Sequence, residues 1–240
     1  MSAPTVVLVH GAFADSSSWN GVVERLRAAG LTAVANANPL RSLSGDAAYL
    51  RDVLTAIDGP VVVVAHSYGG MVATQGAAGL PNVAGLVYVG AFAPDTGESA
   101  FELSAKFPGS TLGDAVVPTP LSDGGAELTI RQDLFHQQFV ADVDEATAAL
   151  MAVAQRPVTA AALNEPLAAE PAWRTVPSWF VHGAEDRNIP AEVLRFVAER
   201  AGSRGTTEVP GASHALGVSQ PDAVAQVVLD AVRAVGEAAA

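Results

Sequence analysis

The segment that decides the fold reads Val61-Val62-Val63-Val64-Ala65-His66-Ser67-Tyr68-Gly69-Gly70. Its first five residues form a short apolar run rich in β-branched side chains, which is typical of a strand buried on both faces. The residues that follow, Met71–Gln75, favour a helix. The segment therefore predicts a strand, a very sharp turn and a helix, with Ser67 at the apex of the turn.

Small residues stand two positions before and two positions after Ser67, namely Ala65 and Gly69. This spacing matches the nucleophile elbow G-x-S-x-G, with alanine in the first glycine position. Such a turn lifts the serine hydroxyl out of the sheet edge and points the backbone N–H of Tyr68 toward a carbonyl under attack. A simple turn or N-cap serine is the alternative, but the strand–turn–helix context favours a nucleophile.

Composition narrows the class of protein. The chain has 240 residues, a formal net charge of −12 and no cysteine. An acidic surface repels nucleic acids and anionic membranes, and no apolar stretch reaches the roughly 18 residues of a membrane helix. The missing cysteines exclude disulfides, thiolate metal sites and a cysteine nucleophile. Because Met1–Pro4 leads straight into a strand with no secretory signal, we expect a cytoplasmic protein.

Short apolar runs alternate with amphipathic stretches along most of the chain. The predicted strands are Thr5–Val9, Thr32–Ala35, Val61–Ala65, Asn82–Val89, Val176–Val181 and Thr206–Val209. The predicted helices are Trp19–Ala29, Ser44–Ile57, the stretch after Ser67, Pro190–Arg200 and Pro221–Val235. This alternation predicts an α/β fold with a mostly parallel sheet and helices on both faces.

The alternation stops between residues 96 and 173, which contain no clear buried strand. We interpret this segment as a cap of short helices inserted into a core formed by residues 1–95 and 174–240, because a structureless loop of this length is rare in a compact domain. The cap helices are expected at Leu128–Phe139, Glu145–Gln155 and Thr159–Leu163, after a stretch over Pro108–Gly125 in which Gly, Pro, Ser and Thr dominate. The alanine-rich tail Glu237–Ala240 is expected to be frayed.

Three residues suited to nucleophilic catalysis follow the carboxyl ends of three predicted strands: Ser67, Asp186 and His214. Ligands of parallel sheets bind at this edge, and the order Ser, Asp, His is that of a strand-end triad. His214 would take the serine proton, and Asp186 would fix the imidazole tautomer. Asp95, after the fourth strand, is an alternative acid, and Glu185 is expected to be a solvated neighbour.

An oxyanion hole needs two backbone donors, for which we select Tyr68 and Ala12, the latter in the loop after the first strand. Gly11 leaves room for the close approach of a substrate. Aromatic residues are candidates for an apolar pocket, although some will be core. The candidates beside Gly11 are Phe13, Phe92, Phe135, Phe139 and Trp173. No H-E-x-x-H motif, carboxylate cluster or glycine-rich phosphate loop is present, so neither a metal nor a nucleotide cofactor is indicated.

With these motifs the chain resembles the α/β-hydrolase superfamily, and within it the small esterases grouped with plant methylesterases and hydroxynitrile lyases. The matching segments are Val7–Phe13, Ala65–Gly70, Gly90–Glu98, Trp179–Pro190 and Gly211–Leu216. The lyases of this group place a hydroxyl residue after the first-loop histidine and a lysine soon after the catalytic histidine. Here Gly11 and Ala215, followed by Leu216 and Gly217, occupy those places, which favours ester hydrolysis.

The sequence thus predicts a serine hydrolase of the carboxylesterase type, acting through an acyl-enzyme on a small or medium, largely apolar ester or lactone. Two other classes stay open: a catalytically weak ligand receptor on the same fold, and a carbon–carbon lyase, carbon–carbon hydrolase or perhydrolase using the same triad. The expected partner is a small molecule rather than a nucleic acid or a membrane. The oligomeric state is left open, a homodimer included.

Overall fold

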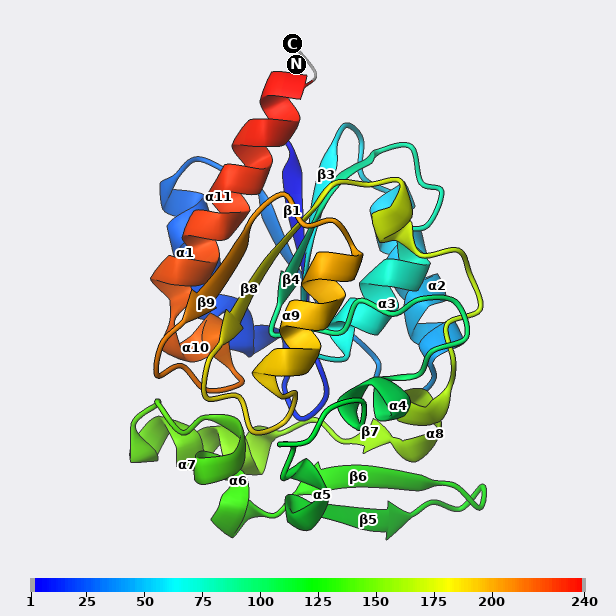
Figure 1. Cartoon of the computed structure of the whole chain (residues 1–240), viewed down its shortest axis with the longest axis vertical. Coiled ribbons are helices and arrows are strands. Elements are labelled where there is room, and N and C mark those ends of the chain that lie inside the picture. The colour runs from blue at the N-terminus through cyan, green and yellow to red at the C-terminus, as the bar shows by residue number, and fades with distance from the viewer. Residues whose placement is uncertain (1–2, 239–240) are drawn as a thin grey trace.

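The computed structural model describes residues 3–238. Its centre is a parallel sheet with strand order β2-β1-β3-β4-β8-β9 (Figure 1). The strands are β1 (Thr5–Val9), β2 (Ala33–Asn36), β3 (Val61–His66), β4 (Val83–Val89), β8 (Ser178–Gly183) and β9 (Thr206–Val209). The predicted α/β class and parallel sheet are therefore confirmed, and each predicted strand overlaps an observed one.

Helices cover both faces of the sheet. The core helices are η1 (Ser16–Trp19), α1 (Asn20–Ala28), α2 (Leu43–Thr55), α3 (Gly69–Gly76), α9 (Ala191–Arg200), α10 (Leu216–Ser219) and α11 (Pro221–Ala238). The central strand explains this arrangement, because Val61 and Val63 pack in the cluster with α2, α3 and α9, while Val62 and Val64 pack in the cluster with α1 and α11. All six residues of β3 are buried. A continuous apolar run is what a strand between two helical layers requires.

The inserted segment contains the helices α4 (Ala100–Ser104), α5 (Leu112–Ala115), α6 (Gln132–Phe139), α7 (Glu145–Ala154), α8 (Ala160–Asn164) and η2 (Ala172–Arg174). It also contains an antiparallel sheet of β5 (Val116–Pro120), β6 (Ala126–Ile130) and β7 (Val158–Thr159). The helix predicted over Leu128–Phe139 is observed as α6 but begins only at Gln132, because Leu128–Ile130 belong to β6. The stretch Pro108–Gly125, where Gly, Pro, Ser and Thr dominate, contains α5 and β5.

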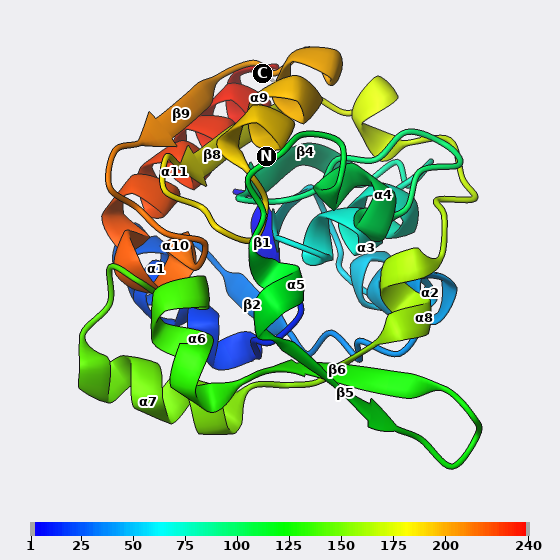
Figure 2. The same ribbon diagram turned by 60° about the horizontal axis from the view of Figure 1, so that its bottom comes forward.

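The cap, drawn in green, lies below the core, across the end of the sheet where β8 finishes (Figure 1, Figure 2). Two helices differ from prediction at the other end of the chain. The short helix α10 begins at Leu216, two residues after His214, and α11 continues to Ala238, so Glu237 and Ala238 are helical rather than frayed. Residues 239–240 of that predicted tail, like residues 1–2 of the predicted core, lie outside the described residues. Within residues 3–238, no helix combines the length and apolar character needed to cross a bilayer.

Candidate active site

Ser67 occupies the apex between β3 and α3 with a φ of 53°, a left-handed conformation that is unusual for serine. Such a residue costs on the order of 1–3 kcal/mol and persists only where its surroundings impose it. The Ser67 carbonyl accepts from Gly70 N–H at 2.9 Å and from Phe92 N–H at 3.3 Å. A Cβ at Gly70 would lie 2.0 Å from the Phe92 oxygen, and one at Gly69 would lie 2.5 Å from the Val9 oxygen. Both glycines are therefore needed for the turn.

Asp186 and His214 form a buried pair. The His214 Nδ1–H donates to Asp186 Oδ2 at 2.7 Å, and the two side chains are 1% and 0% exposed. The other carboxylate oxygen, Asp186 Oδ1, accepts from the N–H groups of Asn188 at 2.8 Å and Ile189 at 2.9 Å. Because Nδ1 carries the shared proton, the Nε2 atom of neutral His214 is the nitrogen able to accept a proton.

Two neighbouring rings hold His214 in place. His66 Nε2–H donates to the His214 carbonyl at 3.0 Å, and the two ring centroids are 4.7 Å apart. Burial, together with the nearby His214 ring, keeps the pKa of His66 well below its usual value, so His66 stays neutral and serves as a donor. Phe139 packs edge-on against the His214 ring at 5.2 Å between centroids. The position of the imidazole is thus fixed by contacts on several sides.

Ser67 and His214 line one cavity of about 380 Å³. Within residues 3–238, the Ser67 hydroxyl makes no hydrogen bond to the His214 ring. Catalytic hydrogen bonds are often long in unliganded enzymes and tighten when substrate is bound. Gly11 packs directly against the elbow, since a Cβ on it would lie 2.6 Å from Ser67 Cβ and 3.2 Å from Ser67 Oγ.

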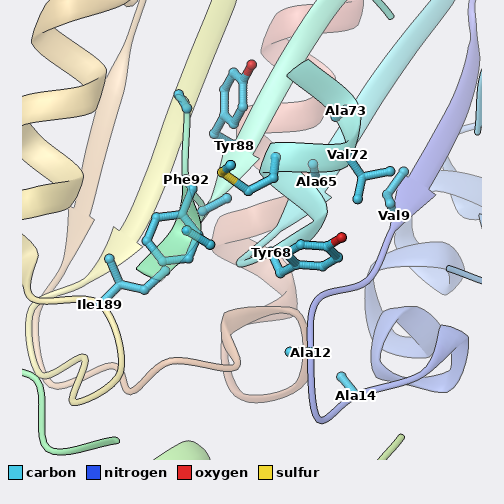
Figure 3. Packing of buried hydrophobic residues seen from close by; sticks show 14 of the residues in the cluster. Val9, Ala12, Ala14, Ala65, Tyr68, Val72, Ala73, Tyr88, Phe92 and Ile189 are labelled. Atoms are coloured by element: carbon cyan, nitrogen blue, oxygen red, sulfur yellow. The ribbon is translucent and has the colours of Figure 1, made fainter. Parts of the chain in front are cut away.

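Ala12 and Tyr68, the predicted oxyanion donors, line the same cavity as Ser67. Figure 3 shows Tyr68 at the start of α3, with Ala12 on the neighbouring loop and Phe92 and Ile189 to the other side. The Tyr68 hydroxyl donates to the buried carboxylate of Asp46 at 3.0 Å. Burial raises the pKa values of both Tyr68 and Asp46, so the phenol stays protonated. The pair anchors the residue whose backbone N–H would face the substrate.

The predicted pocket residues divide into two groups. Phe13 and Phe92 line the cavity as expected. The other four, Gly11, Phe135, Phe139 and Trp173, are not among its lining residues, which corrects the prediction for them. Phe135 is fully buried in the core against Phe139, with ring centroids 5.1 Å apart. Trp173 Nε1–H donates to the Pro94 carbonyl at 2.8 Å. Their large apolar area is used for packing, which is the usual fate of aromatic side chains.

Most of the cavity-lining residues that the sequence analysis did not identify come from the cap. These residues are Ala100, Phe101, Ser104, Ser110, Leu112, Gly113, Val116, Pro118, Leu128 and Leu163, joined by Asn188 and Ile189 from the core. The wall is mainly apolar, and its polar members carry no charge. Nothing in the spacing of these residues identifies them, because they come from five separate elements of the cap.

The alternative acid, Asp95, pairs with an arginine and not with His214. Asp95 accepts two hydrogen bonds from Arg174, at 2.7 and 2.8 Å, and that ion pair lowers its pKa despite partial burial. Glu185 is exposed. Within the described range, no group of three or more His, Asp or Glu side chains is arranged to hold a metal ion. Asp186 is thus the carboxylate that the fold brings to His214.

A model of the alpha/beta hydrolase family matches residues 6–227. The chain belongs to this family. A carbendazim-hydrolysing esterase from Nocardioides sp. (strain SG-4G) is 38% identical over 113 residues, which cover 42% of this chain and 47% of that enzyme. The match thus spans about half the length of this curated relative.

Solved structures of the hydrolase fold superpose over nearly the whole chain. Polyneuridine aldehyde esterase has a TM-score of 0.81 at 20% identity, covering 95% of this chain and 99% of that one. A pyrethroid hydrolase from Sphingobium faniae JZ-2 has a TM-score of 0.77 at 20% identity, covering 98% of this chain and 100% of that one. The methylesterase MES16 from Arabidopsis has a TM-score of 0.79 at 17% identity, covering 96% of this chain and 99% of that one. The resemblance to plant methylesterases is confirmed as a likeness of fold.

One contact that the sequence did not indicate joins the cap to the loop carrying His214. Asp142, between α6 and α7, accepts a hydrogen bond from the hydroxyl of Ser213. Its other oxygen accepts from Gln220 Nε2 at 3.3 Å. Ser213 is buried and directly precedes His214. Asp142 therefore ties the position of the cap to that of the imidazole, across 71 residues of sequence.

Proposed function

We propose that this chain is a serine hydrolase that cleaves a carboxylic ester or lactone of largely apolar character. The observation that carries the proposal is the shared cavity: a strained serine at the apex of an elbow and the histidine of a buried His–Asp pair line the same apolar space of about 380 Å³. The Nocardioides relative is described as an esterase, which agrees with this class of reaction.

The reaction would proceed in two halves. His214 Nε2 takes the proton of Ser67 Oγ as the oxygen attacks the ester carbonyl, and Asp186 stabilises the resulting imidazolium. The backbone N–H groups of Ala12 and Tyr68 donate to the oxyanion, and the imidazolium returns its proton to the departing alkoxide. Water, deprotonated by His214, then releases the acid from Ser67 and restores the enzyme.

The charge distribution around the cavity favours hydrolysis over lyase chemistry. The lone lysine of the chain is Lys106, and its ammonium lies over the ring of Phe196, 4.7 Å from the centroid. Lys106 is not among the cavity-lining residues, and neither is any arginine. An ammonium that could stabilise a departing anion such as cyanide is therefore not supplied by the cavity wall.

The test is a panel of p-nitrophenyl esters varied in acyl length. We expect Ser67→Ala and His214→Ala each to lower kcat by about 10⁴-fold or more, since members of a triad act as a unit. Ser104→Ala is the matched control, because it removes a hydroxyl from the same cavity and should stay within about threefold of the wild type. Turnover of every ester by Ser67→Ala at the wild-type rate would remove Ser67 from the proposed role.

A further inference from the structure

A second cavity, of about 230 Å³, adjoins the catalytic one. Phe13 lines both cavities. The second cavity lies between the segment from Ala14 to Ser18 of η1, helix α7 with Met151 and Ala154, and Val218 of α10. Its wall is mostly apolar and includes the exposed side chain of Leu150.

The two cavities extend toward opposite sides of the cap. The catalytic cavity is bounded by Val116, Pro118 and Leu128 of the β5–β6 hairpin, whereas the second is bounded by α7. The hairpin and α7 lie on opposite sides of the cap in both views (Figure 1, Figure 2). An ester whose carbonyl carbon sits at Ser67 has two arms, an acyl group and an alkoxy group, which leave that carbon in different directions. The catalytic cavity can take one arm, and the second cavity, which shares Phe13 with it, is available for the other.

Phe13, which lines both cavities, has a strained backbone conformation. Its φ is 60°, which is uncommon for any residue with a Cβ and is a marked outlier for a bulky one. The conformation is imposed by the cap, because the Phe13 N–H donates to the carbonyl of Arg156 at 3.1 Å. The ring packs edge-on against Phe139 with 6.3 Å between centroids. Strain of this kind gathers at functional sites, where neighbouring structure holds a residue in a rare state.

We propose that the second cavity is a subsite for one apolar arm of the ester, and that the Phe13 ring is the movable partition between it and the catalytic cavity. The preferred substrates would then be esters with an apolar group of several carbon atoms on both sides of the ester bond. This inference rests on the proposed ester hydrolysis at Ser67. The flexible thioether of Met151 adapts the subsite to arms of different shape.

The experiment compares two esters of phenylacetic acid: the methyl ester, with one large arm, and the naphthylmethyl ester, with two. Ala154 lines the second cavity but not the catalytic one, so Ala154→Phe fills the second cavity from the side of α7. We expect it to lower kcat/KM for the naphthylmethyl ester at least tenfold and to leave the methyl ester within twofold. Ala149→Phe is the control, since Ala149 is exposed on the same helix and does not line the cavity. Phe13→Ala should raise the naphthylmethyl-to-methyl ratio of kcat/KM about tenfold.

A ratio of kcat/KM that Ala154→Phe leaves unchanged would overturn the subsite. Failure of the proposed function looks different: the wild type would hydrolyse neither ester, or Ser67→Ala would hydrolyse both. In that case the subsite can still be tested by binding alone. The naphthylmethyl ester is titrated calorimetrically into Ser67→Ala and into the double variant Ser67→Ala/Ala154→Phe. The subsite predicts at least tenfold weaker binding in the double variant, and equal binding would overturn it.

Discussion

Gly11→Ala is the substitution that most directly tests how the elbow is packed. The new methyl would lie 2.6 Å from Ser67 Cβ and 2.8 Å from the His66 carbonyl oxygen. Ordinary contact begins near 3.4 Å, so the elbow and the first loop must separate by about 0.8 Å. Neither neighbour is the far end of a flexible side chain, so the movement must come from backbone.

That separation moves the nucleophile and the adjacent Ala12 donor at the same time. Misplacing reacting groups by about 1 Å can cost on the order of 100-fold in rate. Overpacking of a core position costs roughly 1–3 kcal/mol of stability. We therefore expect Gly11→Ala to lower kcat toward the best p-nitrophenyl ester about 100-fold while the protein remains folded.

The assay pairs steady-state kinetics with urea denaturation. Gly236→Ala on α11 is the control, because nothing lies within 4 Å of its added Cβ and alanine favours a helix by about 0.5–1 kcal/mol. It should keep wild-type kcat. A Gly11→Ala enzyme with kcat within threefold of the wild type and unchanged stability would refute the packing argument.

Three further outcomes follow from buried polar contacts. Asp142→Ala should lower kcat about tenfold and leave KM within twofold of the wild type, because the Ser213 hydroxyl next to His214 loses its acceptor. Asp142→Asn keeps an acceptor oxygen and should retain most of the wild-type rate. Tyr68→Phe leaves the Asp46 carboxylate without its phenol donor and should cost about 1–3 kcal/mol in urea unfolding. Because burial raises the pKa of Asp46, that cost should shrink in mildly acidic buffer. Burial also lowers the pKa of His10 below its ordinary value of 6.5. As the pH falls through 6.5, His10 therefore takes up a proton in the unfolded chain before it does so in the folded chain. The free energy of unfolding should then fall by up to about 1.4 kcal/mol at pH 5.5 through this group, and His10→Asn should remove that part of the pH dependence.

The sheet and the strand-end residues could be predicted because several local signals agree there. The four valines of β3 lie between two helical layers, and the small residues beside Ser67 fit only a very tight turn. The loops after β8 and β9 carry Asp186 and His214 to the same edge, as parallel strands require. Periodicity, turn chemistry and chain order thus point to one arrangement.

The cap could not be predicted in the same way, because its sheet depends on distant pairing. Strand β5 contains Pro118 and Pro120, and proline within a run normally argues against a strand. The structure tolerates both, since β5 is an edge strand that pairs only with β6. Strand β6 in turn pairs with Val158–Thr159, about 30 residues further along the chain. No local sequence pattern predicts this pairing of β6 with β7.

The pocket aromatics show a second reason for failure. Apolar character predicts burial for Phe13, Phe92 and Phe135 alike, but not which surface each side chain meets. Phe13 and Phe92 lie on loops at the strand ends and reach the cavity, whereas Phe135 lies on α6 and turns into the core. Pocket lining depends on how the cap packs on the sheet, which the sequence of either part alone does not give.

The most direct test of the central claim is to locate a covalent adduct. The protein is treated with a fluorophosphonate probe, digested and analysed by peptide mass spectrometry, with Asp186→Asn and His214→Ala treated in parallel. The mechanism predicts one probe per chain on Ser67, no labelling of Ser67→Ala, and labelling slowed by at least 100-fold in the two triad variants. A probe that attaches to another serine, or that labels Ser67→Ala as fast as the wild type, would contradict it.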